Sequence, residues 1–308
     1  MRLLKNTNFK FIEKSRVAFI LSGLLILGGL ISEAVHGGPE LSIDFTGGTI
    51  LQVQVTPAPS TPAVREALEA GGFQDFQVQD FGSDSEFLIT FREVEGGDEG
   101  LDTAERMLAA LSSGLPGTQV EMRREESVGP KIGDELKTAA VNSVVAALLL
   151  IVLYITVRFI FRYGIAAIVA LVHDVIITLG IFSILNKEIS LTIIAAFLTI
   201  IGYSLNDTIV VFDRIRENMR LRRKESYEGV VNRSINETLS RTIVTSLTTL
   251  FVALTLFIWG GPVIHDFAFA LVMGVVIGTY SSIFVASPVL VWWHKRQVTD
   301  AKRAQPSL

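Results

Sequence analysis

The sequence predicts an α-helical membrane protein with six transmembrane helices and a small α+β domain after the first of them. Composition is the main observation, since 49% of the 308 residues are hydrophobic and the mean hydropathy is +0.47. A helix needs about 20 mostly apolar residues to cross a bilayer. Six segments qualify: residues 17–35, 138–157, 164–185, 190–212, 242–259 and 267–293. This composition excludes a disordered chain and argues against a soluble enzyme.

The distribution of charge predicts the orientation of the chain. Lys and Arg concentrate in residues 1–16, 158–162, 213–241 and 294–308, which all fall on one side of a six-span protein. Residues 37–137 instead carry 19 acidic and 7 basic groups. Because loops rich in Lys and Arg stay in the cytoplasm, both termini are expected to be cytoplasmic and residues 36–137 extracytoplasmic. The basic groups fit topology and contact with membrane lipids rather than nucleic acid.

The first span follows a basic leader and could be read as a signal peptide. Its apolar stretch is long and lacks a clean small-x-small cleavage pattern, so an uncleaved anchor is the favoured interpretation. The chain has no cysteine, which excludes disulfides and thiolate metal sites. The four histidines are scattered without metal-ligand spacing. No metal or other cofactor is therefore expected.

The segment after the first span alternates between strand and helix patterns. Alternating apolar residues predict half-buried strands, and caps and glycines bound two helices. In chain order the expected strands and helices cover residues 49–55, 60–70, 74–81, 86–91, 102–111 and 118–124, with a turn at 82–85. The order β-α-β-β-α-β is typical of a ferredoxin-like domain. It shows no nucleophile–base pair or phosphate loop, so a docking module is favoured over an enzyme, and the acidic residues 93–99 are expected in a solvated loop.

Two glycine-containing segments join this domain to the first and second spans. The first runs from Ile43 to Thr49 and contains Asp44, Gly47 and Gly48, and its paired glycines permit positive φ. The second runs from Val128 to Gly133 with Gly129 and Pro130, which predict an irregular connection. Both segments are candidate hinges or plain connectors, and residue pattern alone favours plain connectors.

A carboxylate lies where lipid is expected. Asp207 sits in the apolar run 191–212, and a charge inside such a run costs at least ~2.5 kcal/mol on insertion scales. Arg241, at the start of the next run, is its candidate partner, although it also fits a simple positive-inside anchor. A static ion pair and proton handling are equally supported by spacing. Helical spacing places further polar or small residues on the same face: Thr199, Gly202, Tyr203 and Asn206.

His173 and Asp174 form a second candidate site near the middle of the third span. Imidazole titrates near neutrality, so the pair is a candidate proton relay. Adjacent residues point to different helix faces, however, so they need not touch, and a hydrogen bond between helices is the favoured interpretation. In the last span Gly274 and Gly278 form a small-xxx-small motif that allows close helix contact. We expect them, with Gly202, to lie in a packed bundle interior.

Four runs of residues resemble one known family. They are Asp44–Thr49, Val128–Gly133, Gly202–Arg214 with its Asn-Asp-Thr motif at 206–208, and Ser234–Thr242. These runs are similar to SecF, a subunit of the bacterial SecDF protein-export complex within the RND transporter superfamily. The resemblance covers the chain from the first span to the last. Ser42 departs from the glycine that is usual before the Ile-Asp-Phe run.

The resemblance implies fold, function, partners and location. It implies half of an RND-type pseudo-symmetric bundle in the bacterial cytoplasmic membrane, which uses the proton-motive force to promote late steps of preprotein export. The implied partners are SecD, the SecYEG channel, the translocating preprotein and, as a further candidate, YajC. It places Asp207 and Arg241, with the neighbouring Asn206 and Thr208, on a proton path. Protons are the expected coupling ion, and sodium stays open as an alternative.

Two other functions stay open from the sequence. One is half of a small-molecule or lipid exporter of the same superfamily, although such exporters usually carry twelve spans and large outer domains in one chain. The other is a purely structural translocase subunit with a static bridge between Asp207 and Arg241. No catalytic constellation appears, so we do not expect an enzyme.

Overall fold

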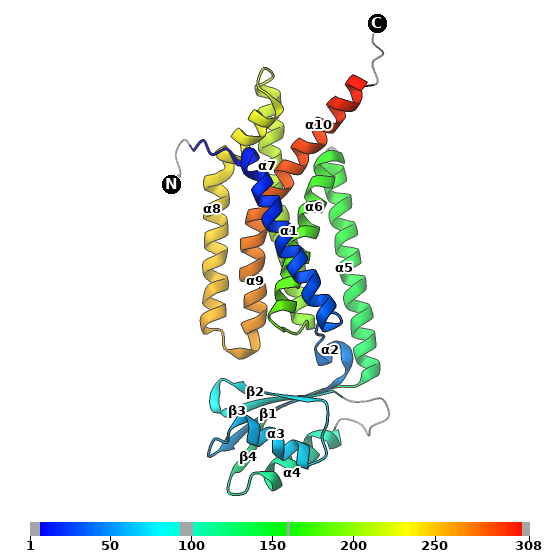
Figure 1. Cartoon of the computed structure of the whole chain (residues 1–308), viewed down its shortest axis with the longest axis vertical. Helices are drawn as coiled ribbons and strands as arrows, with labels where there is room; N and C mark the ends of the chain where they lie inside the picture. The colour runs from blue at the N-terminus through cyan, green and yellow to red at the C-terminus, as the bar shows by residue number, and fades with distance from the viewer. Residues whose placement is uncertain (1–6, 93–100, 159–160, 304–308) are drawn as a thin grey trace. The chain divides into compact units, whose positions relative to one another are not determined.

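A computed structural model of the chain describes residues 7–92, 101–158 and 161–303. The chain divides into two compact units, here called the helical unit and the sheet unit. The helical unit comprises residues 1–39, 144–187 and 192–308, and the sheet unit comprises residues 40–143 and 188–191. Figure 1 shows the helices and strands of both. The acidic stretch that is predicted as a solvated loop, residues 93–99, lies outside the described residues.

Six helices in the described part of the chain are long and apolar enough to cross a membrane, which confirms the predicted fold class. Each predicted span lies inside one of them, apart from residues 185 and 190, which fall one residue outside α6 and α7. In chain order they are α1 (Phe11–His36), α5 (Pro130–Arg158), α6 (Phe161–Ile184), α7 (Leu191–Leu221), α8 (Tyr227–Trp259) and α9 (Pro262–Ser281), the last continuing through the π-helical turn η1 (Ser282–Ala286) into α10 (Ser287–Arg303).

Two of these helices extend well beyond their apolar runs. The basic segment 213–241 is helical except at residues 222–226, because α7 continues to Leu221 and α8 starts at Tyr227. Adding residues to an existing helix is far easier than starting one. Ser226 also caps α8, since its Oγ accepts a hydrogen bond from Gly229 N at 3.2 Å. The hydropathy pattern alone marks where a helix leaves lipid, not where it ends.

The interior of the helical unit is formed mainly by α6, α7 and the α9–α10 helix. About half of the apolar stretch of each is buried, whereas only 6% of the stretch in α5 and 17% in α1 and α8 is buried. Lipid tails or another protein are needed to cover those apolar faces. The core includes Tyr163 and Phe212, whose rings meet edge to face at 5.2 Å between centroids.

Glycines set the closest helix crossings. A Cβ on Gly274 of α9 would lie 2.2 Å from Ile200 Cγ1, and one on Gly278 would lie 3.0 Å from Ser204 Cβ, so both glycines admit α7. Gly202 differs from the prediction, because nothing lies within 4 Å of its Cβ position. One crossing that brings backbone against backbone was not predicted: Gly29 of α1 lies against Gly180 of α6, with a Cβ on Gly29 only 2.6 Å from Gly180 Cα.

The sheet unit has the predicted β-α-β-β-α-β order. Its elements are α2 (Ile43–Thr46), β1 (Gly48–Thr56), α3 (Thr61–Ala70), β2 (Phe76–Phe81), β3 (Ser83–Phe91), α4 (Leu101–Gly114) and β4 (Gln119–Val128). The sheet order is β2-β3-β1-β4 with all neighbours antiparallel, which is the ferredoxin-like topology. Leu51, Val53 and Val55 alternate into the core and are fully buried.

Two predicted boundaries in this unit are wrong. The turn predicted at 82–85 consists of Gly82 alone. Its φ of +75° reverses the chain so that β3 begins at Ser83. β4 runs on to Val128 because it pairs with β1 up to Gly48. Only Gly129 then separates β4 from α5, which starts at Pro130, a residue suited to the first turn of a helix.

Candidate functional site

Asp207 is buried inside the helical unit, with an exposed fraction of 2%. Its Oδ2 accepts a hydrogen bond from Ser246 Oγ of α8 at 3.3 Å. Ser246 Oγ in turn accepts from Thr279 Oγ1 of α9 at 2.7 Å. A row of hydroxyls thus leads from α9 through α8 to the carboxylate on α7.

The ion pair between Asp207 and Arg241, one of the two interpretations that their spacing supports, is not formed among the residues that the structure describes. The two lie more than 4 Å apart, and Arg241 is exposed. The reason is helical geometry: Asp207 contacts Ser246, and five residues along α8 turn Arg241 by about 140° to another face. Asn206 is also exposed, whereas Thr208 is buried at 1%. Among the described residues Asp207 therefore contacts one hydroxyl, that of Ser246, and no cation within 4 Å.

Two buried hydroxyls on the same helix faces have no hydrogen-bond partner among the described residues. They are Tyr203 Oη, four residues before Asp207 on α7, and Thr242 Oγ1, four residues before Ser246 on α8. Residues four apart on a helix share a face. Buried polar groups normally find a partner. These two hydroxyls lie one turn before Asp207 on α7 and one turn before Ser246 on α8.

The side chains of His173 and Asp174 are in direct contact, although adjacent residues of a helix point to different faces. His173 Nδ1 lies 2.9 Å from Asp174 Oδ1. Asp174 Oδ2 accepts hydrogen bonds from Ser204 Oγ of α7 at 2.5 Å and from Ser281 Oγ of α9 at 2.8 Å. Asp174 is completely buried. The sequence predicted a hydrogen bond between helices here, and Asp174 makes two, one to α7 and one to α9.

The other ring nitrogen of His173 extends the contacts to the first helix. His173 Nε2 lies 2.9 Å from Ser22 Oγ of α1, and Ser22 Oγ lies 3.1 Å from Tyr280 Oη of α9. Tyr280 Oη donates to the carbonyl oxygen of Ala18 at 2.7 Å. Sequence reasoning missed Ser22, Ser204 and Tyr280, whose only signal is a hydroxyl inside an apolar run. Together with Ser281, they join α1, α6, α7 and α9 around one buried pair.

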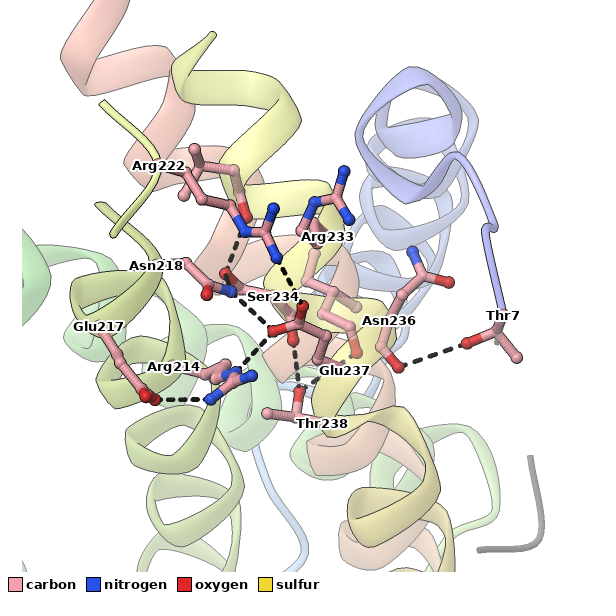
Figure 2. A network of polar contacts seen from close by, with 12 residues as sticks. Thr7, Arg214, Glu217, Asn218, Arg222, Arg233, Ser234, Asn236, Glu237 and Thr238 are labelled. Atoms are coloured by element: carbon pink, nitrogen blue, oxygen red, sulfur yellow. Dashed lines mark hydrogen bonds and ion pairs between the residues drawn. The ribbon is translucent and has the colours of Figure 1, made fainter. Parts of the chain in front are cut away.

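A third polar network lies where α7 and α8 extend beyond their apolar runs (Figure 2). Glu237 accepts hydrogen bonds from Asn218 Nδ2 at 2.8 Å and from Arg214 Nε at 2.6 Å. Burial alone would raise the pKa of Glu237. The Asn218 hydrogen bond and the charges of Arg214 and Arg222 outweigh burial and hold that pKa below its ordinary value. Glu237 is thus kept ionised and locks the two helices together.

The same region of α8 holds the segment that leads into α1. Asn232 Oδ1 accepts from Phe11 N at 2.7 Å, and Asn236 Oδ1 accepts from Phe9 N at 2.8 Å. Both amides donate back to the carbonyl oxygen of Phe9 at 2.9 Å. Two asparagines one turn apart on α8 therefore satisfy backbone groups at the start of α1 that a helix leaves unpaired.

The two candidate connectors meet inside the sheet unit. Gly47 and Gly48 both have positive φ, +75° and +137°, as predicted for the paired glycines of the first connector. A Cβ on Gly47 would lie 2.9 Å from Pro130 Cα, and one on Gly133 would lie 3.1 Å from Gly47 N. Backbone therefore packs on backbone where the two connectors cross, which requires glycine.

Asp44 has a specific partner in this unit. Its Oδ2 accepts a hydrogen bond from the backbone nitrogen of Leu191, the first residue of α7, at 2.9 Å. Leu41 and Ile189 add an isolated parallel β-bridge. A carboxylate at a helix N-terminus satisfies a free N–H and opposes the helix dipole. Asp44 thereby ties the connector to the start of the helix that carries Ser204 and Asp207.

Comparison with known proteins identifies the family. Residues 110–296 match the family described as protein export membrane protein SecD/SecF, C-terminal, and residues 35–59 match the SecD/SecF GG motif. Protein translocase subunit SecF of Rhodothermus marinus is 47% identical over 297 residues, covering 94% of this chain and 95% of that protein. The SecF subunit of Gemmatimonas aurantiaca is 42% identical over 312 residues, covering 99% and 93%.

Solved structures give the same result. The crystal structure of SecDF from Thermus thermophilus, a translocon-associated membrane protein, is 41% identical and superposes with a TM-score of 0.83 over 94% of this chain. A second SecDF structure, in a super-membrane-facing form, has a TM-score of 0.69. The chain spans about two fifths of each SecDF chain, 39% and 41%. The family model covers more than half of the chain and the relatives nearly all of it, so the chain belongs to the SecD/SecF family of protein export membrane proteins.

Proposed function

We propose that this chain acts as a SecF-type auxiliary subunit of the Sec translocase and couples proton movement to late steps of preprotein export. Its relatives along nearly the full length are protein translocase subunits, whereas nothing among them favours a small-molecule or lipid exporter. In this proposal the partners are a SecD-type subunit, the SecYEG channel with YajC, the preprotein and membrane lipids. The location is the bacterial inner membrane, with both termini cytoplasmic.

The buried carboxylate of Asp207 carries the proposal. Asp207 is 2% exposed inside an apolar helix, and no cation among the described residues lies within 4 Å of its carboxylate. An ionisable group in such a position usually marks an ion or proton pathway. The hydroxyls of Ser246 and Thr279 can hold either protonation state. One proton crossing 100 mV releases about 2.3 kcal/mol. That energy shifts a two-state helix packing by roughly 50-fold.

The place of Arg241 supports a partner subunit. An exposed arginine near the apolar run of α8 lies on one of the three helices whose apolar faces are mostly uncovered in this chain. The matched SecDF chains are about two and a half times as long, which leaves room for a second set of spans. We infer that Arg241 faces the SecD-type half and that the proton path, with Asn206 and Thr208, runs between the two halves. Protons remain our proposed coupling ion.

The connectors provide a route from the bundle to the sheet unit. Asp44 holds the first turn of α7, and Asp207 lies on the same helix, sixteen residues beyond Leu191. A change of helix packing around Asp207 would pull on this hydrogen bond. We propose that the sheet unit then turns about Gly47, Gly48 and Gly129 while it contacts the emerging preprotein.

The test is preprotein export by vesicles that contain the SecD-type partner and the channel, with and without an imposed proton gradient. Asp207→Asn keeps the shape and the Ser246 hydrogen bond but removes the titration, so we expect loss of the gradient-dependent part of export alone. Asp213→Asn is the matched control, because Asp213 lies on the same helix but is exposed and paired with Arg158 at 3.1 Å. Equal stimulation in wild type and Asp207→Asn would instead assign Asp207 a structural role. Replacing the proton gradient by a sodium gradient distinguishes the two coupling ions.

A further inference from the structure

The hydrogen bonds around His173 fix how many protons the His173–Asp174 pair holds. The carbonyl oxygen of Ala18 can only accept a hydrogen bond. Tyr280 Oη therefore donates its single hydrogen to Ala18 O. The contact between Ser22 Oγ and Tyr280 Oη must then use the hydrogen of Ser22. Ser22 has no hydrogen left for His173, so His173 Nε2 must carry its own hydrogen and donate it to Ser22.

The contact between the two members of the pair needs a further proton. His173 Nδ1 and Asp174 Oδ1 lie 2.9 Å apart, and one hydrogen must lie between them. With Nε2 already protonated, the pair is either an imidazolium beside a carboxylate or a neutral imidazole beside a carboxylic acid. Both forms have a net charge of zero. The structure therefore corresponds to the pair with its dissociable proton bound.

We propose that His173 and Asp174 form a second proton-binding site, and that proton release from this pair breaks the hydrogen bond between Tyr280 of α9 and Ala18 of α1. When one proton leaves, neutral His173 keeps a hydrogen on Nδ1 to donate to the carboxylate, and Nε2 becomes bare. Ser22 must then turn its hydrogen toward Nε2. Tyr280 must in turn donate to Ser22, and the carbonyl oxygen of Ala18 loses its donor.

The proposal gives the proton a structural consequence. Tyr280 Oη–Ala18 O is a side-chain bond between α1 and α9, and the Tyr280 ring also stacks on His173 at 6.1 Å between centroids. On the other side of the pair, Ser281 is the last residue of α9 before the π-helical turn η1. Such turns interrupt the regular helical ladder and often lie at functional sites. The bound proton thus favours one packing of α1 and α9 around α6.

Other ionisable groups on the packed helices do not contact the pair in the described structure. On α1 the charged residues flanking Ser22 are Arg16 and Glu33, and α10 has its first titratable group at His294. η1 has none, and α9 has His265 and Asp266 in its first turn, which contact each other and Lys187, and Tyr280 near its end. α7 contributes Tyr203 and Asp207, and Asp207 accepts a hydrogen bond from Ser246 rather than from the pair. No described cation contacts the pair, so a net charge of −1 there would be held by hydroxyls alone.

The experiment is a titration of histidine by nitrogen NMR on the full chain, assembled with its SecD-type partner in membranes. The chain has four histidines, so His173 is assigned with His173→Gln. We expect His173 Nε2 to be protonated at low pH and to lose its hydrogen as pH rises, while Nδ1 keeps one. An Nε2 that stays protonated over the whole range in which the protein is folded overturns the proposal.

Two variants test the coupling. Tyr280→Phe removes the acceptor of Ser22, which frees the Ser22 hydroxyl to donate to bare Nε2, so we expect about a tenfold loss of proton affinity, the value of one hydrogen bond. Ser32→Ala is the matched control, because Ser32 Oγ joins α1 to α6 through Ser183 Oγ at 2.8 Å, as Ser22 does through His173, without touching the pair. An unchanged midpoint in Tyr280→Phe overturns the coupling.

A third variant tests the proposal independently in case Tyr280→Phe does not fold. Asp174→Asn can donate permanently to Nδ1, which keeps hydrogen on Nε2, so the titration of His173 should disappear, and its persistence overturns the assignment. Asp207→Asn should leave the titration of His173 in place. This result separates the second site from the function that is proposed for Asp207.

Discussion

Substitution of Gly29 by alanine tests how closely α1 and α6 must approach. A Cβ on Gly29 would lie 2.6 Å from Gly180 Cα and 3.5 Å from Gly180 C, and both are backbone atoms that cannot rotate away. Carbon atoms prefer separations of about 3.5–4.0 Å. The two helices would have to separate by about 1 Å locally. Overpacking of this kind typically costs about 1–3 kcal/mol.

The neighbouring glycine provides the control. Nothing lies within 4 Å of a Cβ on Gly28, which precedes Gly29 on the same turn of α1. Alanine raises helix propensity at both positions by a similar amount, about 1 kcal/mol in water. The propensity term therefore cancels in the difference between the two variants. We expect Gly29→Ala to be less stable than Gly28→Ala by about 1–3 kcal/mol.

Reversible unfolding in mixed micelles measures both free energies, and cysteine pairs introduced across α1 and α6 report whether the helices have separated. Gly180→Ala should behave like Gly29→Ala, because its Cβ would lie 2.7 Å from Gly29 Cα. Equal stability of Gly29→Ala and Gly28→Ala would refute the reasoning from close backbone contact.

Two further predictions concern the ends of the helices. The lowered pKa of Glu237 means that its ionised form stabilises the contact between α7 and α8. This stability is fully present above the ordinary glutamate pKa, and it is lost as the pH falls through the lowered pKa of Glu237. Glu237→Gln should therefore be less stable than wild type at neutral pH and less sensitive to acid, as measured by unfolding between neutral and acidic pH; parallel acid curves would contradict this. Asp44→Ala removes the acceptor of Leu191 N and should cost about 0.5–2 kcal/mol of local stability. Faster amide exchange confined to the first turn of α7 checks it, with Asp84→Ala, at an exposed position of β3, as the control.

The fold followed from patterns that are local in the sequence. Apolar runs of about 20 residues leave the backbone no alternative to a helix in lipid, because a helix alone satisfies its own N–H and C=O groups there. Alternation in β1, with Leu51, Val53 and Val55 on one side, likewise predicts a half-buried strand whatever its neighbours are. The order of these elements was enough to predict the ferredoxin-like topology.

Boundaries and partners depended on tertiary structure. β4 extends to Val128 because β1 offers it backbone partners up to Gly48, which no local pattern in β4 shows. Gly29 and Gly180 are 151 residues apart, so their contact has no signal in sequence spacing. By contrast, Gly274 and Gly278 lie within one helix, so their motif could be recognised from the sequence. The sequence did not show that α7 is the helix that packs against them.

The sequence by itself determined where charge enters the membrane: Asp207 and the His173–Asp174 pair stand out because a titratable group in an apolar run is costly. Only the tertiary structure decided what each group touches. It gave Asp207 the hydroxyl of Ser246 instead of Arg241, and it surrounded His173 and Asp174 with hydroxyls from three other helices. The physical reason is that a charge is costly by virtue of its own chemistry, whereas the direction of a hydrogen bond depends on how the helices cross and rotate against one another.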